Sequence, residues 1–283
     1  MSIDALQEKI RKRKSALLLD LTLFPEELPQ EYADAYPRYC LALLKGLKGR
    51  IPGVRFRFSH FALLGAQTLS QLPTLLKEAK DLGFYVLLDA PEAYSSQQAT
   101  FTAQTLLHPG GEYYCDGIIL PFYAGSDILQ PYLSYCEDQK KDVFALARTP
   151  NKSAPELQDL LTGTRLVHTA VAARVERFAA STAGKYGYAC LGVAAAATAP
   201  DSLKALRSKY PGLFLLADGL DYPSGNMKNV SLIFDKLGRG GAYCARQMVS
   251  CAWQKGDGSD SIAAAVQEVE RQKAGLQRYV TFL

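Results

Sequence analysis

Short apolar runs alternate with longer amphipathic stretches along most of the chain. Most of the apolar runs are continuous, which is typical of parallel strands that are covered on both faces. We interpret eight of them as strands, at residues 16–21, 54–58, 84–90, 117–121, 143–148, 188–194, 213–218 and 242–246. The stretches between them carry apolar residues at the spacing of one helix face. We expect helices at residues 66–82, 95–107, 127–136, 163–182 and 200–209, with an N-terminal helix in 1–14 and a C-terminal helix in 259–283.

This alternation of strands and helices predicts parallel βαβ units. About eight such units in a chain of 283 residues match the length of a (β/α)₈ barrel. A doubly wound open sheet is the main rival, but it usually needs fewer strands, and no GxGxxG follows the first strand here. No linker rich in proline, glycine or serine divides the chain. We therefore predict an α/β fold, a (β/α)₈ TIM barrel that forms a single domain over residues 1–283.

The composition narrows the range of partners. The chain has 32 basic and 28 acidic residues, and its net charge of +4 is too mild to indicate nucleic-acid binding. No apolar run reaches the roughly 18–20 residues that a membrane-spanning helix needs. The six cysteines contain no CxxC pair, which favours buried free thiols over disulfides or a zinc site. With no secretion signal, these features predict a cytoplasmic protein with no metal site that binds neither nucleic acid nor membranes.

Polar side chains stand at the carboxyl ends of the predicted strands, where barrel proteins place their chemistry. The mouth of the barrel, meaning the opening at that end, would collect Asp20, Arg55, Asp89, Asp218 and Arg246. Opposed charges around a cavity suit a polar, anionic small molecule. Arg246, at the end of the eighth strand, is well placed to bind a phosphate. Gly219 and Gly225 would offer accessible backbone N–H groups nearby.

Each charged residue of the mouth also has an ordinary structural interpretation. Asp20 and Asp89 could cap the following loops or pair with a neighbouring arginine. Arg246 could form a structural ion pair. Because side chains alternate along a strand, we expect one of Arg55 and Arg57 to point out of the barrel.

Several segments resemble, in order and spacing, those of one known family. Leu19-Asp20 followed by EELP (26–29) resembles its opening GLDP…LP segment, and FSHFALLG (58–65) resembles its AFFEAFG segment. DILQPY (127–132) is similar to the stretch after the fourth strand, FALARTPNKSAPELQ (144–158) to FVLVRTSNPSA…LQ, and AYCAR (242–246) to the segment that ends in Ser-Arg. From about residue 15 to residue 253, the chain resembles the longer, bacterial type of orotidine 5′-phosphate decarboxylase.

This resemblance implies a homodimeric barrel that removes CO₂ from orotidine monophosphate without a cofactor. The family uses a lysine on the second strand and an Asp-x-Lys-x-x-Asp motif after the third, whose last aspartate enters the neighbouring subunit's site. The middle lysine protonates the carbon that loses the carboxylate, where a cation also stabilises the developing negative charge. By the same resemblance Asp20 would contact the ribose and Arg246 the phosphate.

The chain departs from this pattern at the catalytic positions. The motif aligns with Asp89-Ala90-Pro91-Glu92-Ala93-Tyr94, so that Pro91 takes the place of the lysine and Tyr94 the place of the second aspartate. Arg55 replaces the lysine of the second strand. No lysine lies between Asp81 and Lys140, so a small shift of the alignment does not restore the motif.

The binding positions are partly retained. In the segment that reads the pyrimidine, Pro150 replaces a serine, whereas Thr149 and Asn151 remain. Pro223 replaces the glutamine that contacts phosphate after the seventh strand. Asp20, Asp89 and Arg246 are also retained.

Three hypotheses follow. The first is a diverged decarboxylase-like barrel, without normal activity, that retains a mouth for a phosphorylated small molecule such as a pyrimidine nucleotide. The second is an enzyme with new acid/base chemistry on such a molecule, which requires that five side chains converge: Asp89, Glu92, Tyr94, His60 and Asp218. The third is a non-catalytic interaction partner of an active paralogue.

Overall fold

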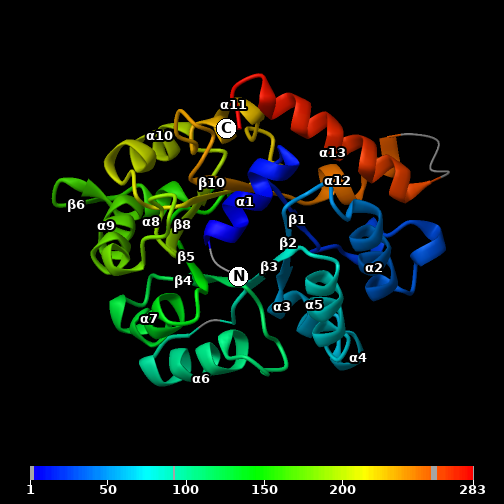
Figure 1. Cartoon of the computed structure of the whole chain (residues 1–283), viewed down its shortest axis with the longest axis horizontal. Coiled ribbons are helices and arrows are strands. Elements are labelled where there is room, and N and C mark those ends of the chain that lie inside the picture. The colour runs from blue at the N-terminus through cyan, green and yellow to red at the C-terminus, as the bar shows by residue number, and fades with distance from the viewer. Residues whose placement is uncertain (1–2, 92, 256–259, 283) are drawn as a thin grey trace.

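The barrel predicted from the sequence is present in the computed structural model, which describes residues 3–91, 93–255 and 260–282. Eight parallel strands close in the order β1-β10-β9-β8-β5-β4-β3-β2 (Figure 1). The strands are β1 (Leu17–Asp20), β2 (Gly53–Arg57), β3 (Tyr85–Asp89), β4 (Gly117–Pro121), β5 (Asp142–Leu146), β8 (Leu191–Ala196), β9 (Leu215–Asp218) and β10 (Gly241–Ala245). All eight predicted strands are confirmed, with bounds that shift by a few residues.

The first and last strands close the barrel. Leu18 of β1 pairs with Gly53 of β2 on one side and with Cys244 of β10 on the other. Every residue of β1 and of β10 is buried, which explains why these runs are continuously apolar rather than alternating. Inside the barrel, a Cβ at Gly117 would collide with the Tyr85 hydroxyl, so the small residue makes room for a large neighbour.

A ring of helices covers the outside of the barrel. The longer ones are α2 (Tyr36–Leu47), α5 (Leu72–Asp81), α6 (Ser96–Leu107), α7 (Gln130–Glu137), α9 (Val167–Ala179), α10 (Pro200–Lys209) and α13 (Ser261–Gln277). Short helices lie at α3 (Phe58–Leu63), α4 (Ala66–Leu69), α8 (Pro155–Gln158), α11 (Met227–Ser231) and α12 (Gln247–Ser250). Local signals set several ends: Ser95 caps α6 through the Gln98 N–H, and α10 begins with proline.

Two predicted helices differ from the structure. The stretch 66–82 forms the separate helices α4 and α5. The stretch 163–182 begins as a hairpin of β6 (Leu161–Thr162) and β7 (Arg165–Leu166), and only then becomes α9. Gly163 adopts a φ of +62° in the hairpin turn, a conformation that favours glycine and ends helical periodicity. The expected start of the C-terminal helix at residue 259 lies outside the described residues.

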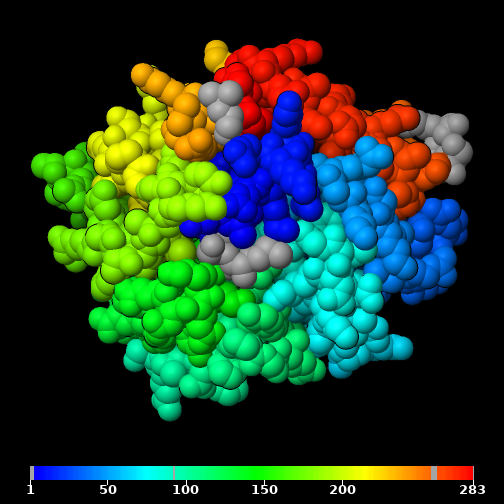
Figure 2. Space-filling model, viewed as in Figure 1, coloured from blue at the N-terminus to red at the C-terminus, as the bar shows by residue number. Residues whose placement is uncertain are grey.

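Helix α1 (Ile3–Arg13) crosses the amino ends of the strands. The Ile3 N–H donates to Asp142 Oδ1 (2.9 Å), at the first residue of β5, and Gln7 Oε1 accepts from the Gly240 N–H (3.0 Å), just before β10. Lys9 Nζ donates to the carbonyl of Gly83 (2.7 Å), just before β3. In Figures 1 and 2 this helix, in blue, lies at the centre of the face in view. The carboxyl ends of the strands therefore form the mouth at the opposite end.

The interior leaves the thiols unpaired and inaccessible. All six cysteines are free and buried, as the sequence predicted. Burial raises the thiol pKa of Cys40, Cys115 and Cys251 to about 12. Over the described part of the chain, none of the helices combines the length and apolar character needed to cross a membrane.

Candidate functional site in the mouth of the barrel

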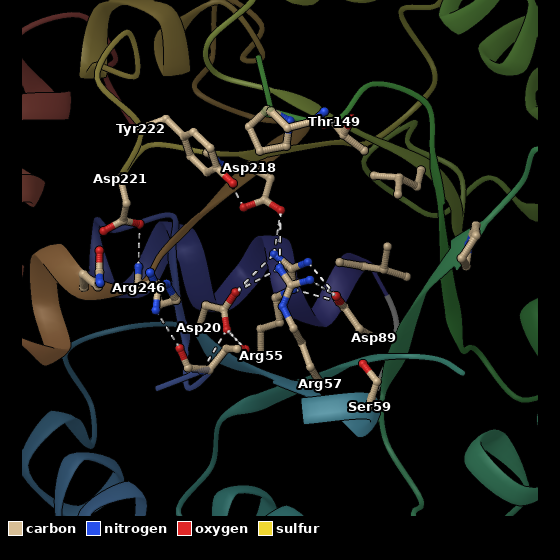
Figure 3. A pocket seen from close by; sticks show the side chains of 18 of the residues that line it. Asp20, Arg55, Arg57, Ser59, Asp89, Thr149, Asp218, Asp221, Tyr222 and Arg246 are labelled. Atoms are coloured by element: carbon tan, nitrogen blue, oxygen red, sulfur yellow. Dashed lines mark hydrogen bonds and ion pairs between the residues drawn. The ribbon is translucent and has the colours of Figure 1, made fainter. Parts of the chain in front are cut away.

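A cavity of about 740 Å³ opens at the carboxyl ends of the strands (Figure 3). Its lining includes eight of the residues that the sequence singled out for this site: Asp20, Arg55, Asp89, Thr149, Asn151, Asp218, Gly219 and Arg246. They converge because parallel strands in a barrel present all their carboxyl ends at one opening. Asp218, Asp221 and Tyr222, from the end of β9 and the segment after it, complete one wall.

Arg55 is the centre of the charged cluster at the base of this cavity. Its Nε and Nη2 donate to the two oxygens of Asp89 (2.8 and 2.7 Å), and its Nη1 donates to Asp218 Oδ2 (2.8 Å). The third carboxylate, Asp20, has its Oδ2 3.4 Å from Nη1. Burial alone would lower the pKa of the guanidinium, but the attraction of Asp218, Asp89 and Asp20 outweighs it and raises that pKa well above its usual value. Arg55 is thus a fixed cation.

Arg57 also points into the mouth, so the expectation that one of the two arginines faces outward was wrong. Its Nη1 lies 3.0 Å from Asp89 Oδ2, and its Nη2 lies 3.4 Å from Asp20 Oδ2. The reason is the pleat: residues two apart on a strand share a face, and only adjacent ones alternate. Arg57 sits directly opposite Asp89 in the β2–β3 register, but its side chain is 35% exposed where that of Arg55 is 3% exposed.

Asp20 is held in its charged form from two directions. The backbone N–H and the hydroxyl of Thr22 both donate to Asp20 Oδ1 (3.0 and 2.5 Å). Burial raises the pKa of the carboxyl, while Arg55, Arg57 and the two Thr22 hydrogen bonds lower it more, so that the net pKa is below the usual value. With Asp89 and Asp218, this makes a cluster of three carboxylates and two guanidinium groups, whose formal charge is one negative unit.

Arg246 lies at another part of the rim and forms an ion pair with the chain itself. Its Nη1 contacts both oxygens of Glu27 (3.1 and 2.9 Å) and the carbonyl of Thr22 (3.1 Å). Gln247 donates its side-chain amide to the same carboxylate. The Arg246 guanidinium also lies over the Phe24 ring, 5.7 Å from its centroid. The structural ion pair considered as an alternative for Arg246 is therefore present, although the arginine still lines the cavity.

Asp221 accepts the backbone N–H groups that follow β10. The N–H of Arg246 donates to Asp221 Oδ2 (2.8 Å), and the N–H of Met248 donates to Oδ1 (2.7 Å). Burial raises the pKa of this carboxyl, and the two N–H groups partly oppose the rise. These donors would otherwise be open to an anionic ligand at the end of β10.

The loop after β5 is internally bonded. Gln158 accepts from the Thr149 N–H (2.8 Å), and Thr149 Oγ1 donates to Asn151 Oδ1 (2.5 Å). Arg148 forms a two-bond ion pair with Asp159 (2.9 and 2.9 Å), and His168 lies 3.1 Å from the same carboxylate. Thr149 and Asn151 are therefore placed in the lining by a rigid local network.

The two glycines predicted for the mouth have different positions. Gly219 lines the cavity, has a φ of +81°, and lies so close to Pro150 that a Cβ would collide with that ring. Gly225 is absent from the cavity lining and instead packs against the carbonyls of Gly219 and Leu220. The loop after β9 thus folds back on itself.

Pro91 and Tyr94, which replace the lysine and the second aspartate of the motif, are absent from the cavity lining, whereas Asp89 and Ala90 of the same segment belong to it. Tyr94 is 72% exposed, and Pro91 lines a separate apolar groove beside α6 together with Phe101. His60 is buried between aromatic rings, with Nε2 2.9 Å from the Leu23 carbonyl. Burial lowers the pKa of this histidine, and the hydrogen bond to the Leu23 carbonyl opposes that effect. Glu92 lies outside the described residues.

Five side chains were required for new acid/base chemistry, and four of them belong to the described residues. Of those four, the structure brings only Asp89 and Asp218 together, through Arg55. Tyr94 and His60 take no part in the cavity lining. Among the described residues, no cluster of histidine, cysteine, aspartate or glutamate is arranged to hold a metal ion.

Sequence reasoning missed Glu27 and Asp221 as parts of the site. Glu27 belongs to the EELP segment and Asp221 to the DGLDYPSG segment, so both segments were noted, but not the roles of these carboxylates. Glu27 is 219 positions from Arg246 in sequence, and no local pattern links them.

Comparison with known proteins extends the resemblance to nearly the whole chain. No family model matches. The orotidine 5′-phosphate decarboxylase of Rhodopirellula baltica is 25% identical over 266 residues, covering 88% of this chain and 87% of that protein. The Clostridium kluyveri enzyme of the same name is 26% identical over 263 residues, covering 90% and 89%. The chain is an orotidine 5′-phosphate decarboxylase-like barrel.

Solved structures support the fold of this decarboxylase-like barrel. The Leishmania donovani OMP decarboxylase superposes with a TM-score of 0.76 at 24% identity, covering 97% of this chain and 98% of the other. The Plasmodium berghei orotidine 5′-monophosphate decarboxylase gives a TM-score of 0.75 at 12% identity, with 98% of both chains covered. The predicted resemblance and the predicted barrel are thus confirmed.

Proposed function

We propose that this chain is a diverged decarboxylase-like barrel that lacks ordinary orotidine 5′-phosphate decarboxylase activity and binds a phosphorylated small molecule in its mouth. A pyrimidine nucleotide is the first ligand to test, because the curated relatives are named for such a substrate. The resemblance also supports a cytoplasmic homodimer that works without a metal or other cofactor.

The observation that carries this proposal is the identity of the cations beside Asp89. Arg55 and Arg57 lie 2.7 and 3.0 Å from Asp89 Oδ2, and the described residues that line the cavity include no lysine. A guanidinium keeps its proton near neutral pH, and in Arg55 the net effect of burial and three carboxylates raises the pKa further. Neither arginine is therefore suited to protonate a carbanion.

The same contacts weaken the electrostatic contribution that an arginine could still make. The hydrogen bonds of Arg55 go to Asp89 and Asp218, so its charge is already balanced by carboxylates. A cation that is balanced in this way stabilises a developing negative charge less than a free one. Loss of the proton donor together with its charge corresponds to several powers of ten in rate.

A turnover assay with orotidine monophosphate tests the loss of activity. We expect no release of CO₂ above the buffer rate from purified protein. An active decarboxylase added to the same mixture is the positive control for the assay. If turnover is seen, Asp89→Asn shows whether it belongs to this site or to a contaminant. A rate near that of ordinary decarboxylases that disappears in the variant would contradict the proposal.

Calorimetric titration with uridine monophosphate tests the ligand class. We expect binding in the mouth, which the variant Arg246→Met should weaken because it removes the cation for the phosphate. Undiminished binding to this variant would show that the phosphate lies elsewhere. Light scattering at several concentrations tests the homodimer, and a chain that stays monomeric throughout would contradict that part of the proposal.

A further inference from the structure

The carboxylate of Glu27 forms an ion pair with Arg246, the cation that a bound phosphate would need. It ends the 3₁₀ turn η1 (Pro25–Glu27), and its side chain turns back to accept the Phe24 N–H (2.9 Å). Its carboxylate also accepts from Arg246 Nη1 and from the Gln247 amide. Only 8% of the residue is exposed. These contacts hold the carboxylate against the rim, where a bound anion would be expected.

Carboxylate and phosphate use the same geometry toward a guanidinium, in which oxygen atoms accept from its N–H groups. Arg246 Nη1 already donates to Glu27 and to the Thr22 carbonyl. The backbone N–H groups of Arg246 and Met248 donate to Asp221. A phosphate that approaches the end of β10 therefore meets one guanidinium nitrogen and two backbone N–H groups that already donate to oxygens of the chain itself.

Electrostatic repulsion between Glu27 and a phosphate makes their competition for Arg246 more severe. The site is partly buried, so repulsion between a phosphate and a neighbouring carboxylate is screened less than it would be in open solvent. Arg55 and Arg57 do not offset it, because both are paired with aspartates. A ligand phosphate must either displace Glu27 from Arg246 or bind beside it against this repulsion.

We propose that Glu27 is a specificity-determining residue of the mouth, which competes with the ligand's phosphate for Arg246 and so reduces the preference for phosphorylated ligands. This inference rests on the proposed function, because it assumes that the mouth binds such a ligand. It distinguishes the chain from a barrel whose phosphate arginine is free.

Titration calorimetry with uridine monophosphate and uridine, at one fixed ionic strength, tests the inference. In Glu27→Gln the side chain keeps its shape but loses its charge, and we expect uridine monophosphate to bind about tenfold tighter or more. The affinity for uridine should stay within about twofold of the wild type, because uridine carries no phosphate. Glu26→Gln is the matched control: it makes the same change on the same turn at an exposed position, and it should leave both affinities within about twofold.

Three outcomes would overturn the inference. If the affinity for uridine monophosphate rises no more in Glu27→Gln than in Glu26→Gln, Glu27 does not compete with the phosphate, while the proposed ligand class stands. An equal gain for uridine shows a general loosening of the mouth. If neither ligand binds to any of the three proteins, the proposed ligand class fails and the inference fails with it.

Two further measurements secure the result. Adding Arg246→Met to Glu27→Gln should remove the gain, since the gain requires the arginine, and a gain that persists would overturn the inference. If Glu27→Gln does not fold, the affinities of the wild-type protein for uridine monophosphate and uridine test the inference. A preference of more than about a hundredfold for uridine monophosphate over uridine would show that Glu27 does not compete.

Discussion

Arg55 and Asp89, from the adjacent strands β2 and β3, form an ion pair with two hydrogen bonds at the base of the mouth. The same guanidinium reaches Asp218 across the barrel, on β9. One arginine thus connects carboxylates from opposite sides of the opening. Such an arrangement fixes the shape of the base of the cavity and holds the Arg55 guanidinium in place.

Removing this arginine should destabilise the barrel strongly. Arg55→Met leaves Asp89, Asp218 and Asp20 close together without their central cation, and we expect a loss of about 3–5 kcal/mol in the free energy of unfolding. Arg57→Met is the matched comparison on the same strand. Its side chain is 35% exposed, so its loss should be about 1 kcal/mol. Urea unfolding measures both, and equal losses would contradict the central role of Arg55.

Asp142 should make the stability of the barrel depend on pH. Burial raises the pKa of this carboxyl to about 8, although hydrogen bonds from Tyr85 and Ile3 oppose the rise. Its value in the unfolded chain is about 4. As the pH rises, the unfolded chain therefore loses the Asp142 proton at a lower pH than the folded protein does. The contribution of Asp142 to the free energy of unfolding falls as the pH rises from about 4 to about 8, by at most about 1.4 kcal/mol per pH unit.

The variant Asp142→Asn isolates this contribution. Below about pH 4, the free energies of unfolding of the wild type and the variant should depend on pH in the same way. Above about pH 4, the wild type should lose stability relative to the variant as the pH rises. Parallel curves over the whole range would show that Asp142 is ionised in the folded protein at neutral pH.

Gly219 should tolerate substitution less well than Gly163, a glycine of the β6–β7 hairpin that also has a positive φ. Gly163→Ala changes a residue with a φ of +62° and open space around it, so only the backbone conformation is penalised, by about 1 kcal/mol. Gly219→Ala carries the same penalty at a φ of +81° and in addition forces a collision with Pro150, for a total of about 3 kcal/mol. Thermal unfolding compares the two, and equal shifts would mean that the loop gives way without cost.

The thiols should be unreactive in the folded protein. All six cysteines are buried, and burial raises the pKa of several of them, so little thiolate is exposed to reagent. A thiol-reactive dye should label none of them at neutral pH within minutes and all 6 in denaturant. Rapid labelling of the native protein at one site would locate a segment that opens readily.

The barrel could be predicted because its strands are read locally. A run such as that of β8 is apolar throughout, and burial on both faces explains it without reference to any distant residue. The meeting of Asp20, Asp89 and Asp218 also followed, since strand ends share one opening. The expectation that one of Arg55 and Arg57 points outward was wrong although the sequence contained the necessary information. The two residues are two apart on one strand, and residues with this spacing share a face.

Other parts of the site could not be predicted, because they depend on pairing between distant loops. The contact between Glu27 and Arg246 joins the segment after β1 to the end of β10. Asp221 accepts backbone N–H groups, which every residue carries, so no side-chain pattern marks its partners. The hairpin of β6 and β7 arises from a turn whose flanking residues also fit helical periodicity.

The pairing of β1 with both β2 and β10 has a consequence during synthesis on the ribosome. Residues 17–20 are made long before residues 241–245, so one of their edges stays without its hydrogen-bonding neighbour until the later segment has been made. Until then the nascent sheet is an open, apolar ribbon with a free edge, and such edges are prone to pair with neighbouring chains.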